Sequence, residues 1–171
     1  SPAELNGESD LTRWDMLKIA FPQWLDRLPP GAVGVVDVGG SCGDSPRQEY
    51  PIGTSHRRLK EAVAGTVAGG ETNLNRMLEK SIEYFDAPRG KRRVVILSDG
   101  GNTCPPQRST CDIARALHRV HGVQIDAVLF KGDAGMEDEY RCIVKATSGR
   151  IIIPDSDMGW KNIEFKMGIF D

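Results

Sequence analysis

The residue best placed to do chemistry in this chain is Asp99, which follows the apolar run Val94–Leu97 and Ser98 and precedes Gly100 and Gly101. Four consecutive branched apolar residues are typical of a strand that is buried on both faces of a parallel sheet. Ligands of open α/β sheets bind just beyond the carboxyl ends of the strands. A carboxylate at that position is placed to meet a hard cation or a polar ligand. The alternative that stays open is a simple Asp-Gly-Gly turn.

Thr72 is the second candidate, in the segment Gly69–Leu74 that precedes an amphipathic helix. Its hydroxyl oxygen has two lone pairs, so it can serve as a ligand of a cation. The same position suits the N-cap of the helix, and the sequence leaves both roles open. Apolar residues recur at helical spacing after Thr72 and predict one apolar face: Leu74, Met77, Leu78, Ile82 and Phe85.

These segments resemble the von Willebrand factor type A domain family, and most of all its bacterial extracytoplasmic members. The resemblance runs from about Leu11 to Pro154 and rests on three motifs. They are Gly-Gly-x-Thr-x-Leu around Thr72, Ser-Asp-Gly-x-x-Thr-Cys from Ser98 to Cys104, and Cys-Ile-x-x-Ala-Thr-x-Gly from Cys142 to Gly149. Members of the family bind a divalent ion, usually Mg²⁺, at a metal-ion-dependent adhesion site.

The resemblance implies roles for five residues around that ion. Thr72 and Asp99 match two of the family's ligand positions, for Mg²⁺ or, alternatively, Mn²⁺ or Ca²⁺. Their neighbours Asn73, Gly100 and Gly101 are expected to contact the partner protein. That partner would supply an acidic side chain to the ion, which is the way the family engages its partners.

The family's third element, Asp-x-Ser-x-Ser at the end of a first strand, has no counterpart near the start of this sequence, which reads Ser1–Gly7. The tail Asn162–Asp171 looks like that first strand ending at its aspartate. Three explanations stay open: a circular permutation of one domain over residues 1–171, a fragment of a longer protein, or an extra edge strand. In the first, Asp171 is a third metal ligand. In all three the serine ligands are absent.

The four cysteines are Cys42, Cys104, Cys111 and Cys142, which allow three pairings. A bridge between Cys104 and Cys111 would close a short ring and pin the loop beside Asp99. A zinc site is not indicated, because no Cys-x-x-Cys or nearby histidine accompanies the pair. Free thiols in a cytosolic protein are the alternative. The family resemblance instead implies disulfides and an extracytoplasmic location, whether periplasmic, secreted or at the cell surface.

Composition excludes several classes of function. The chain has 171 residues and a net charge of −2, which fits one globular domain without a nucleic-acid signal. Its short basic clusters, His56–Arg58 and Lys91–Arg93, lie far apart in the sequence. No apolar stretch approaches the length that spans a bilayer, so we expect no membrane insertion.

The alternation of strand and helix patterns predicts an α/β fold: a Rossmann-like, doubly wound, mainly parallel sheet with helices on both faces. A helix over Leu11–Leu28 should kink or break near Phe21 because of Pro22. Asp112 is the expected N-cap of a later helix, and Gly149 the glycine that ends the last one. The predicted strands are Ala32–Val38, the run before Asp99, Gln124–Phe130 and Ile151–Ile153.

Two further carboxylates are weaker candidates for the site. Asp37 ends a predicted strand and Asp44 lies in the loop after it. A strand-end polar residue and a turn residue are the simpler interpretations of the two.

Three classes of function follow. The first is a non-catalytic adhesion module that binds a partner through the ion. The second is a metal-independent binding scaffold with a degenerate ion site. The third, a metal-dependent phosphoester hydrolase, is disfavoured because the sequence has neither a Walker-type phosphate loop nor a Gly-x-Ser-x-Gly elbow.

Overall fold

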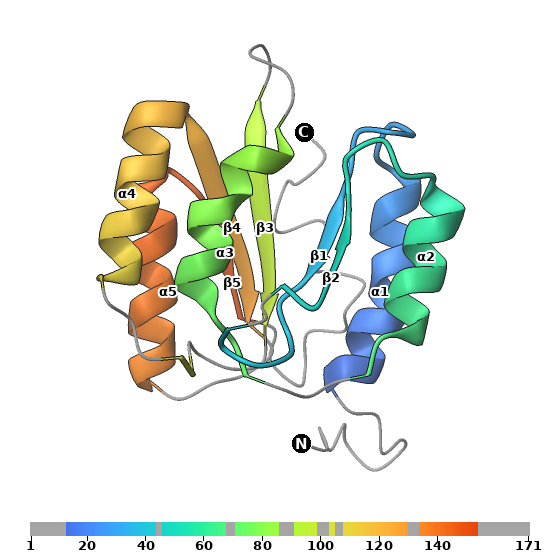
Figure 1. Cartoon of the computed structure of the whole chain (residues 1–171), viewed down its shortest axis with the longest axis horizontal. Helices are drawn as coiled ribbons and strands as arrows, with labels where there is room; N and C mark the ends of the chain where they lie inside the picture. The colour runs from blue at the N-terminus through green and yellow to red at the C-terminus, as the bar shows by residue number, and fades with distance from the viewer. Residues whose placement is uncertain are drawn as a thin grey trace.

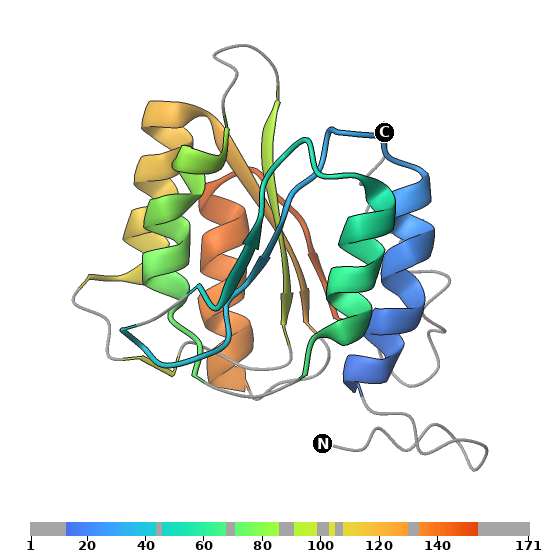
Figure 2. The ribbon, with the colours of Figure 1, turned by 45° about the vertical axis from the view of Figure 1, so that its right-hand side comes forward.

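The computed structural model describes residues 13–43, 46–67, 71–85, 91–98, 103–104, 108–129 and 134–153. The elements are α1 (Arg13–Asp26), β1 (Val35–Asp37), β2 (Gln48–Tyr50), α2 (His56–Gly65), α3 (Leu74–Lys80), the 3₁₀ helix η1 (Ser81–Tyr84), β3 (Arg92–Ser98), α4 (Thr110–His121), β4 (Val123–Leu129), α5 (Ala134–Ala146) and β5 (Ile151–Ile152). The strands lie between two groups of helices, with α3, α4 and α5 on one side and α1 and α2 on the other (Figure 1, Figure 2). This is the Rossmann-like α/β layering that the sequence predicts.

The strands form two sheets among the described residues. Strands β3, β4 and β5 pair in that order and in parallel, with Val94 opposite Ile125 and Ala127 opposite Ile151. Strands β1 and β2 form a separate antiparallel pair. The predicted strand over Ala32–Val38 is therefore shorter than expected. Strand β2 was not predicted, because Gln48–Tyr50 has no apolar run.

The main hydrophobic core lies between the parallel sheet and helices α3, α4 and α5. Strand β4 is central to it: Ile125, Ala127 and Leu129 are fully buried and pack against apolar residues of the three helices. A smaller core joins α1 to α2 through Phe21, Leu25, Leu59 and Val63. No helix in the described part of the chain is long and apolar enough to cross a membrane.

Helix α1 runs through Pro22 to Asp26, so the chain does not break near Phe21, while the alternative, a kink there, stays a prediction. Proline removes one helical hydrogen bond and costs about 3 kcal/mol in a helix interior. Burial of the apolar residues on either side, Phe21 and Leu25, offsets that cost because each contributes about 1.5–3 kcal/mol. Apolar residues at helical spacing in α1, Leu17, Phe21 and Trp24, are all buried.

Two predicted helix-end residues also differ from the structure. Ser109, and not Asp112, is the N-cap of α4, where its hydroxyl accepts a hydrogen bond from the Asp112 backbone N–H. After α5 the left-handed residue is Ser148, with φ of 58°, and not Gly149. Gly149 is required for a different reason: a Cβ there would lie 1.8 Å from the carbonyl oxygen of Ile125. The segment after α5 therefore approaches β4 too closely for a side chain.

Candidate functional site

Three loop segments meet at the end of the parallel sheet where β3 finishes, the lower end in Figure 1. They are residues 38–43 after β1, Glu71–Asn73 before α3, and Thr103–Cys104 after β3. Backbone hydrogen bonds join them: the Glu71 N–H donates to the Gly40 carbonyl at 2.7 Å, and the Thr103 N–H donates to the Thr72 carbonyl at 3.0 Å. Residues far apart in the sequence thus form one loop cluster.

Thr72 lies in the middle of this cluster and is not the N-cap of α3, so the capping interpretation is wrong. The N-cap is Asn73, whose side-chain oxygen accepts from the Arg76 backbone N–H at 3.1 Å. The backbone of Thr72 is used twice, because its N–H donates to Thr103 Oγ1 at 2.6 Å and its carbonyl accepts from Thr103 and Cys104. The Thr72 hydroxyl itself has no hydrogen-bond partner among the described residues and is partly exposed.

Asn73 holds the loops together. While its oxygen caps α3, its side-chain nitrogen donates to the Cys42 carbonyl at 2.8 Å. Both the oxygen and the nitrogen of the side-chain amide therefore form hydrogen bonds within the protein. These bonds explain the role of Asn73 without contact to a partner protein. Contact between Asn73 and a partner protein stays a prediction.

The remaining ligand and partner residues predicted for the ion lie outside the described residues: Asp99, Gly100, Gly101 and Asp171. The strand before Asp99 is confirmed, since β3 ends at Ser98. Asp99 is the next residue in the sequence after this strand, and its role as a ligand stays a prediction.

Asp37 has a structural role in this region. One of its carboxylate oxygens accepts from the Gly39 backbone N–H at 3.0 Å, and the other accepts from Arg47 Nε at 2.9 Å and from the same guanidinium's terminal nitrogen at 2.7 Å. The pair fastens the start of β2 to the end of β1. The simpler interpretation of Asp37 is thus confirmed, while Asp44 lies outside the described residues.

Both disulfides cross between elements, so the local bridge between Cys104 and Cys111 is wrong. Cys42 bonds to Cys104, with 62 residues of sequence separation, and Cys111 bonds to Cys142, with 31. The first bridge connects the loop after β1 to the segment after β3, beside Thr72. The second joins the start of α4 to α5. No free cysteine remains.

Two residues of the loop cluster were not singled out from the sequence. Thr103 supplies the hydroxyl that accepts from the Thr72 N–H, and Glu71 places its carboxylate oxygen 2.9 Å from Cys42 Sγ. Thr103 belongs to the Ser-Asp-Gly-x-x-Thr-Cys motif, so that motif was the available signal. No pattern pointed to Glu71, because its neighbour Cys42 is 29 residues away in the sequence.

A sequence model described as the von Willebrand factor type A domain matches residues 2–102. Among curated proteins none matches the chain. A von Willebrand factor type A structure from Catenulispora acidiphila is 25% identical with a TM-score of 0.69, covering 91% of this chain and 38% of that one. An aerotolerance-related membrane protein from Bacteroides fragilis NCTC 9343, carrying multiple mutations to serines, is 17% identical with a TM-score of 0.68. This match covers 98% of this chain and 94% of that one.

Proximal thread matrix protein 1 from the mussel byssus, solved with a zinc-occupied MIDAS motif, is 17% identical with a TM-score of 0.67. The match covers 99% of this chain and 42% of that one. This chain therefore spans about two fifths of the Catenulispora and mussel structures.

Proposed function

Because the chain belongs to the von Willebrand factor type A domain family, we propose that it is a non-catalytic protein-binding module that engages its partner through a divalent metal ion. The ion would lie at the carboxyl edge of the parallel sheet. One observation carries the proposal: Asn73 takes over the capping of α3, which leaves the Thr72 hydroxyl without a hydrogen-bond partner among the described residues.

The proposed ligands are oxygen atoms, which Mg²⁺ and Mn²⁺ prefer in proteins. Thr72, in the segment before α3, would supply its hydroxyl. Asp99, which follows β3 in the sequence, would supply its carboxylate. A partner's acidic side chain would then replace a water molecule of the ion, drawn by a charge that two protein ligands neutralise only in part. Gly100 and Gly101, with no side chains, leave room for the partner to approach.

Asp171 is the proposed third ligand, which requires the tail Asn162–Asp171 to run as a strand between the two sheets. Strand β3 pairs only with β4, and β1 only with β2, among the described residues. Each sheet therefore has an edge that a further strand can use, and a single domain over residues 1–171 would result. The substitution Asp171→Asn should lower the affinity for the ion about as strongly as Asp99→Asn does.

The alternative is a metal-independent scaffold that binds its partner through the same loops. Its support is that a disulfide and backbone hydrogen bonds join these loops to one another. In either case the two disulfides favour an oxidising location outside the cytoplasm, because such bonds form and persist there.

Thermal unfolding with Mg²⁺, with Mn²⁺ or with a chelator separates the two. An ion at 100 times its dissociation constant stabilises the folded state by about 2.7 kcal/mol. We expect this gain in wild type and in Thr72→Ser, which keeps the hydroxyl, and its loss in Thr72→Val, which keeps the shape. Equal midpoints with ion and with chelator in wild type would favour the scaffold.

A further inference from the structure

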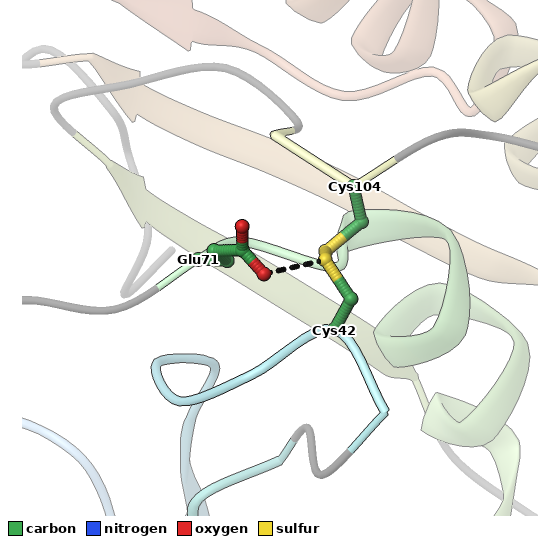
Figure 3. A group of neighbouring side chains, drawn as sticks. All are labelled: Cys42, Glu71 and Cys104. Carbon is green, nitrogen blue, oxygen red and sulfur yellow. Dashed lines mark hydrogen bonds between the residues drawn. A yellow bond between two sulfur atoms is a disulfide. The ribbon is translucent and has the colours of Figure 1, made fainter.

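A second group of ligand atoms lies beside Thr72 and uses none of the proposed oxygen ligands. Cys42, Glu71 and Cys104 place their sulfur and carboxylate oxygen atoms within 4.8 Å of one another (Figure 3). In the described part of the chain no other set of three cysteine, histidine or acidic side chains comes as close. The two sulfurs form the disulfide, and Glu71 Oε2 lies 2.9 Å from Cys42 Sγ.

The polypeptide holds these three residues together independently of the S–S bond. The side chain of Asn73 donates to the Cys42 carbonyl at 2.8 Å, and the Cys104 N–H donates to the Thr72 carbonyl at 3.3 Å. Glu71 is fixed by its own backbone N–H, which donates to Gly40. Opening the disulfide therefore leaves both sulfurs and the carboxylate facing one another. A preorganised set of ligands binds a metal without first ordering a loop.

We propose that reduction of the Cys42–Cys104 disulfide creates a Zn²⁺ site with two thiolate ligands and the Glu71 carboxylate. Zn²⁺ takes sulfur and carboxylate ligands in tetrahedral sites, and three protein ligands leave its fourth position for water. Thiolates select zinc over Mg²⁺, so this site would not compete with the oxygen site at Thr72.

The chemistry balances with a dithiol as reductant. The dithiol gives two electrons and two protons, becomes a disulfide itself, and converts the cystine into two thiols. Zinc binding then forms two Zn–S bonds and releases both thiol protons to solvent. The ion replaces the S–S bond as the link between the loop after β1 and the segment after β3. The loops around Thr72 would thus stay joined in either redox state.

Co²⁺ is the probe, because tetrahedral thiolate ligation gives it sulfur-to-metal charge-transfer absorption that oxygen ligands do not give. The full chain carrying Cys111→Ser and Cys142→Ser is reduced with a dithiol, freed of it, and titrated. We expect one Co²⁺ per chain with that absorption, displaced by Zn²⁺, and no absorption from the oxidised protein. Glu71→Gln changes an exposed side chain, so it should keep the fold while weakening affinity by at least ~10-fold.

Two controls keep this result separate from the proposed function. Thr72→Val should retain the charge-transfer absorption, even if Mg²⁺ proves not to bind. The reduced Cys42→Ser, Cys104→Ser chain, which keeps Cys111 and Cys142, should show none. Reduced protein that is folded by circular dichroism and gives no absorption at one equivalent of Co²⁺ would overturn the inference, as would unchanged affinity in Glu71→Gln.

Discussion

Thr72 and Asn73 illustrate how two adjacent polar residues divide two tasks. Both are good N-cap residues, so the sequence fixes neither the first residue of α3 nor which side chain is spent on capping it. The structure assigns the cap to Asn73, since its oxygen lies 3.1 Å from the Arg76 nitrogen. A shift of one residue in a helix start thus decides whether a threonine hydroxyl is available.

Asp126 provides a residue-scale prediction about stability. It is fully buried in β4, where it accepts from Arg93 Nε at 2.7 Å and from the Arg150 backbone N–H at 2.7 Å. Asp126→Ala removes the buried carboxylate that accepts from the Arg93 guanidinium and from the Arg150 N–H, so we expect a loss of about 3–5 kcal/mol of unfolding free energy. Urea unfolding measures it. The exposed pair Asp112 and Arg115 is the control, where Asp112→Ala should cost at most about 1 kcal/mol.

Gly149 gives a prediction about close packing. A methyl group there would overlap the Ile125 carbonyl, and backbone cannot turn aside as a side chain can. Gly149→Ala should cost at least ~2 kcal/mol of unfolding free energy. Gly65→Ala, at the end of α2 with nothing within 4 Å of the added carbon, should be neutral or slightly stabilising. Similar losses in both variants would refute the packing explanation.

The Cys-Ile-x-x-Ala-Thr-x-Gly motif was found in the sequence, but its purpose becomes clear only from these contacts. Thr147 is fully buried, and its hydroxyl bonds to the backbone of Ile125 and of Ile143. The motif thus joins α5 to the sheet through Thr147 and Gly149, and to α4 through the disulfide of Cys142. A pattern reports which residue types recur, and the structure is needed to say which atoms they touch.

At the scale of elements, the periodicity of apolar residues was sufficient to predict most helices and the parallel strands. It failed for β2, whose three residues are mostly exposed and polar. It also overestimated the length of β1. Short, half-exposed strands are defined by their hydrogen-bonded neighbour, and a single sequence contains little information about that neighbour.

The two disulfides should contribute similar amounts to the stability of the protein, but only one should affect ion binding. Each closes a long loop in the unfolded chain, so removing either should cost about 4 kcal/mol. If the proposed ion site is correct, the Cys42→Ser, Cys104→Ser chain should also bind Mg²⁺ more weakly, since that bridge braces the loops beside Thr72. The Cys111→Ser, Cys142→Ser chain is the matched control and should keep wild-type affinity. Equal Mg²⁺ affinities by calorimetry would contradict this coupling.

A polar link between β2 and the end of α3 predicts a pH dependence. Lys80 Nζ donates to Glu49 Oε1 at 2.6 Å, and the Tyr84 hydroxyl donates to the same oxygen. The hydrogen bond from Lys80, followed by that from Tyr84, lowers the pKa of Glu49. Burial, followed by the hydrogen bond to Glu49, raises the pKa of Tyr84 above its ordinary 10.0.

The signs of the two shifts set opposite ends of the pH range. The depressed pKa of Glu49 gives stability that is present above its ordinary pKa of 4.5 and is lost as pH falls through the folded value. The raised pKa of Tyr84 gives stability that is present below 10.0 and is lost as pH rises through the folded value. The free energy of unfolding of wild type should therefore exceed that of Tyr84→Phe by a constant margin between those two pH limits.

Urea midpoints across the pH range check the margin, which should narrow at both ends. Tyr50→Phe is the control, because the Tyr50 hydroxyl donates to the neutral side chain of Gln48 at 3.0 Å. Its difference from wild type should not follow the same profile. If the stability difference between wild type and Tyr84→Phe did not change with pH, the hydrogen bonds to Glu49 would make no pH-dependent contribution to stability.

For the whole molecule, the fold class was predictable because strands and helices alternate along the chain. The assembly of the loop cluster was not. Residues 38–43, Glu71–Asn73 and Thr103–Cys104 come together only in three dimensions, and the four cysteines allowed three pairings of equal standing. The fold brings three features to one edge of the sheet: the end of β3, a disulfide, and a threonine hydroxyl that has no hydrogen-bond partner in the described part of the chain.

The central claim is that an ion at this edge keeps a water molecule that a partner's carboxylate can replace. Water-proton relaxation of the Mn²⁺-loaded full chain tests it most directly. We predict enhanced relaxation in wild type and Thr72→Ser, a fall on addition of an acidic peptide but not of its amide counterpart, and no enhancement in Thr72→Val. Enhancement that is the same in Thr72→Val, or absent from wild type at millimolar Mn²⁺, would contradict the account.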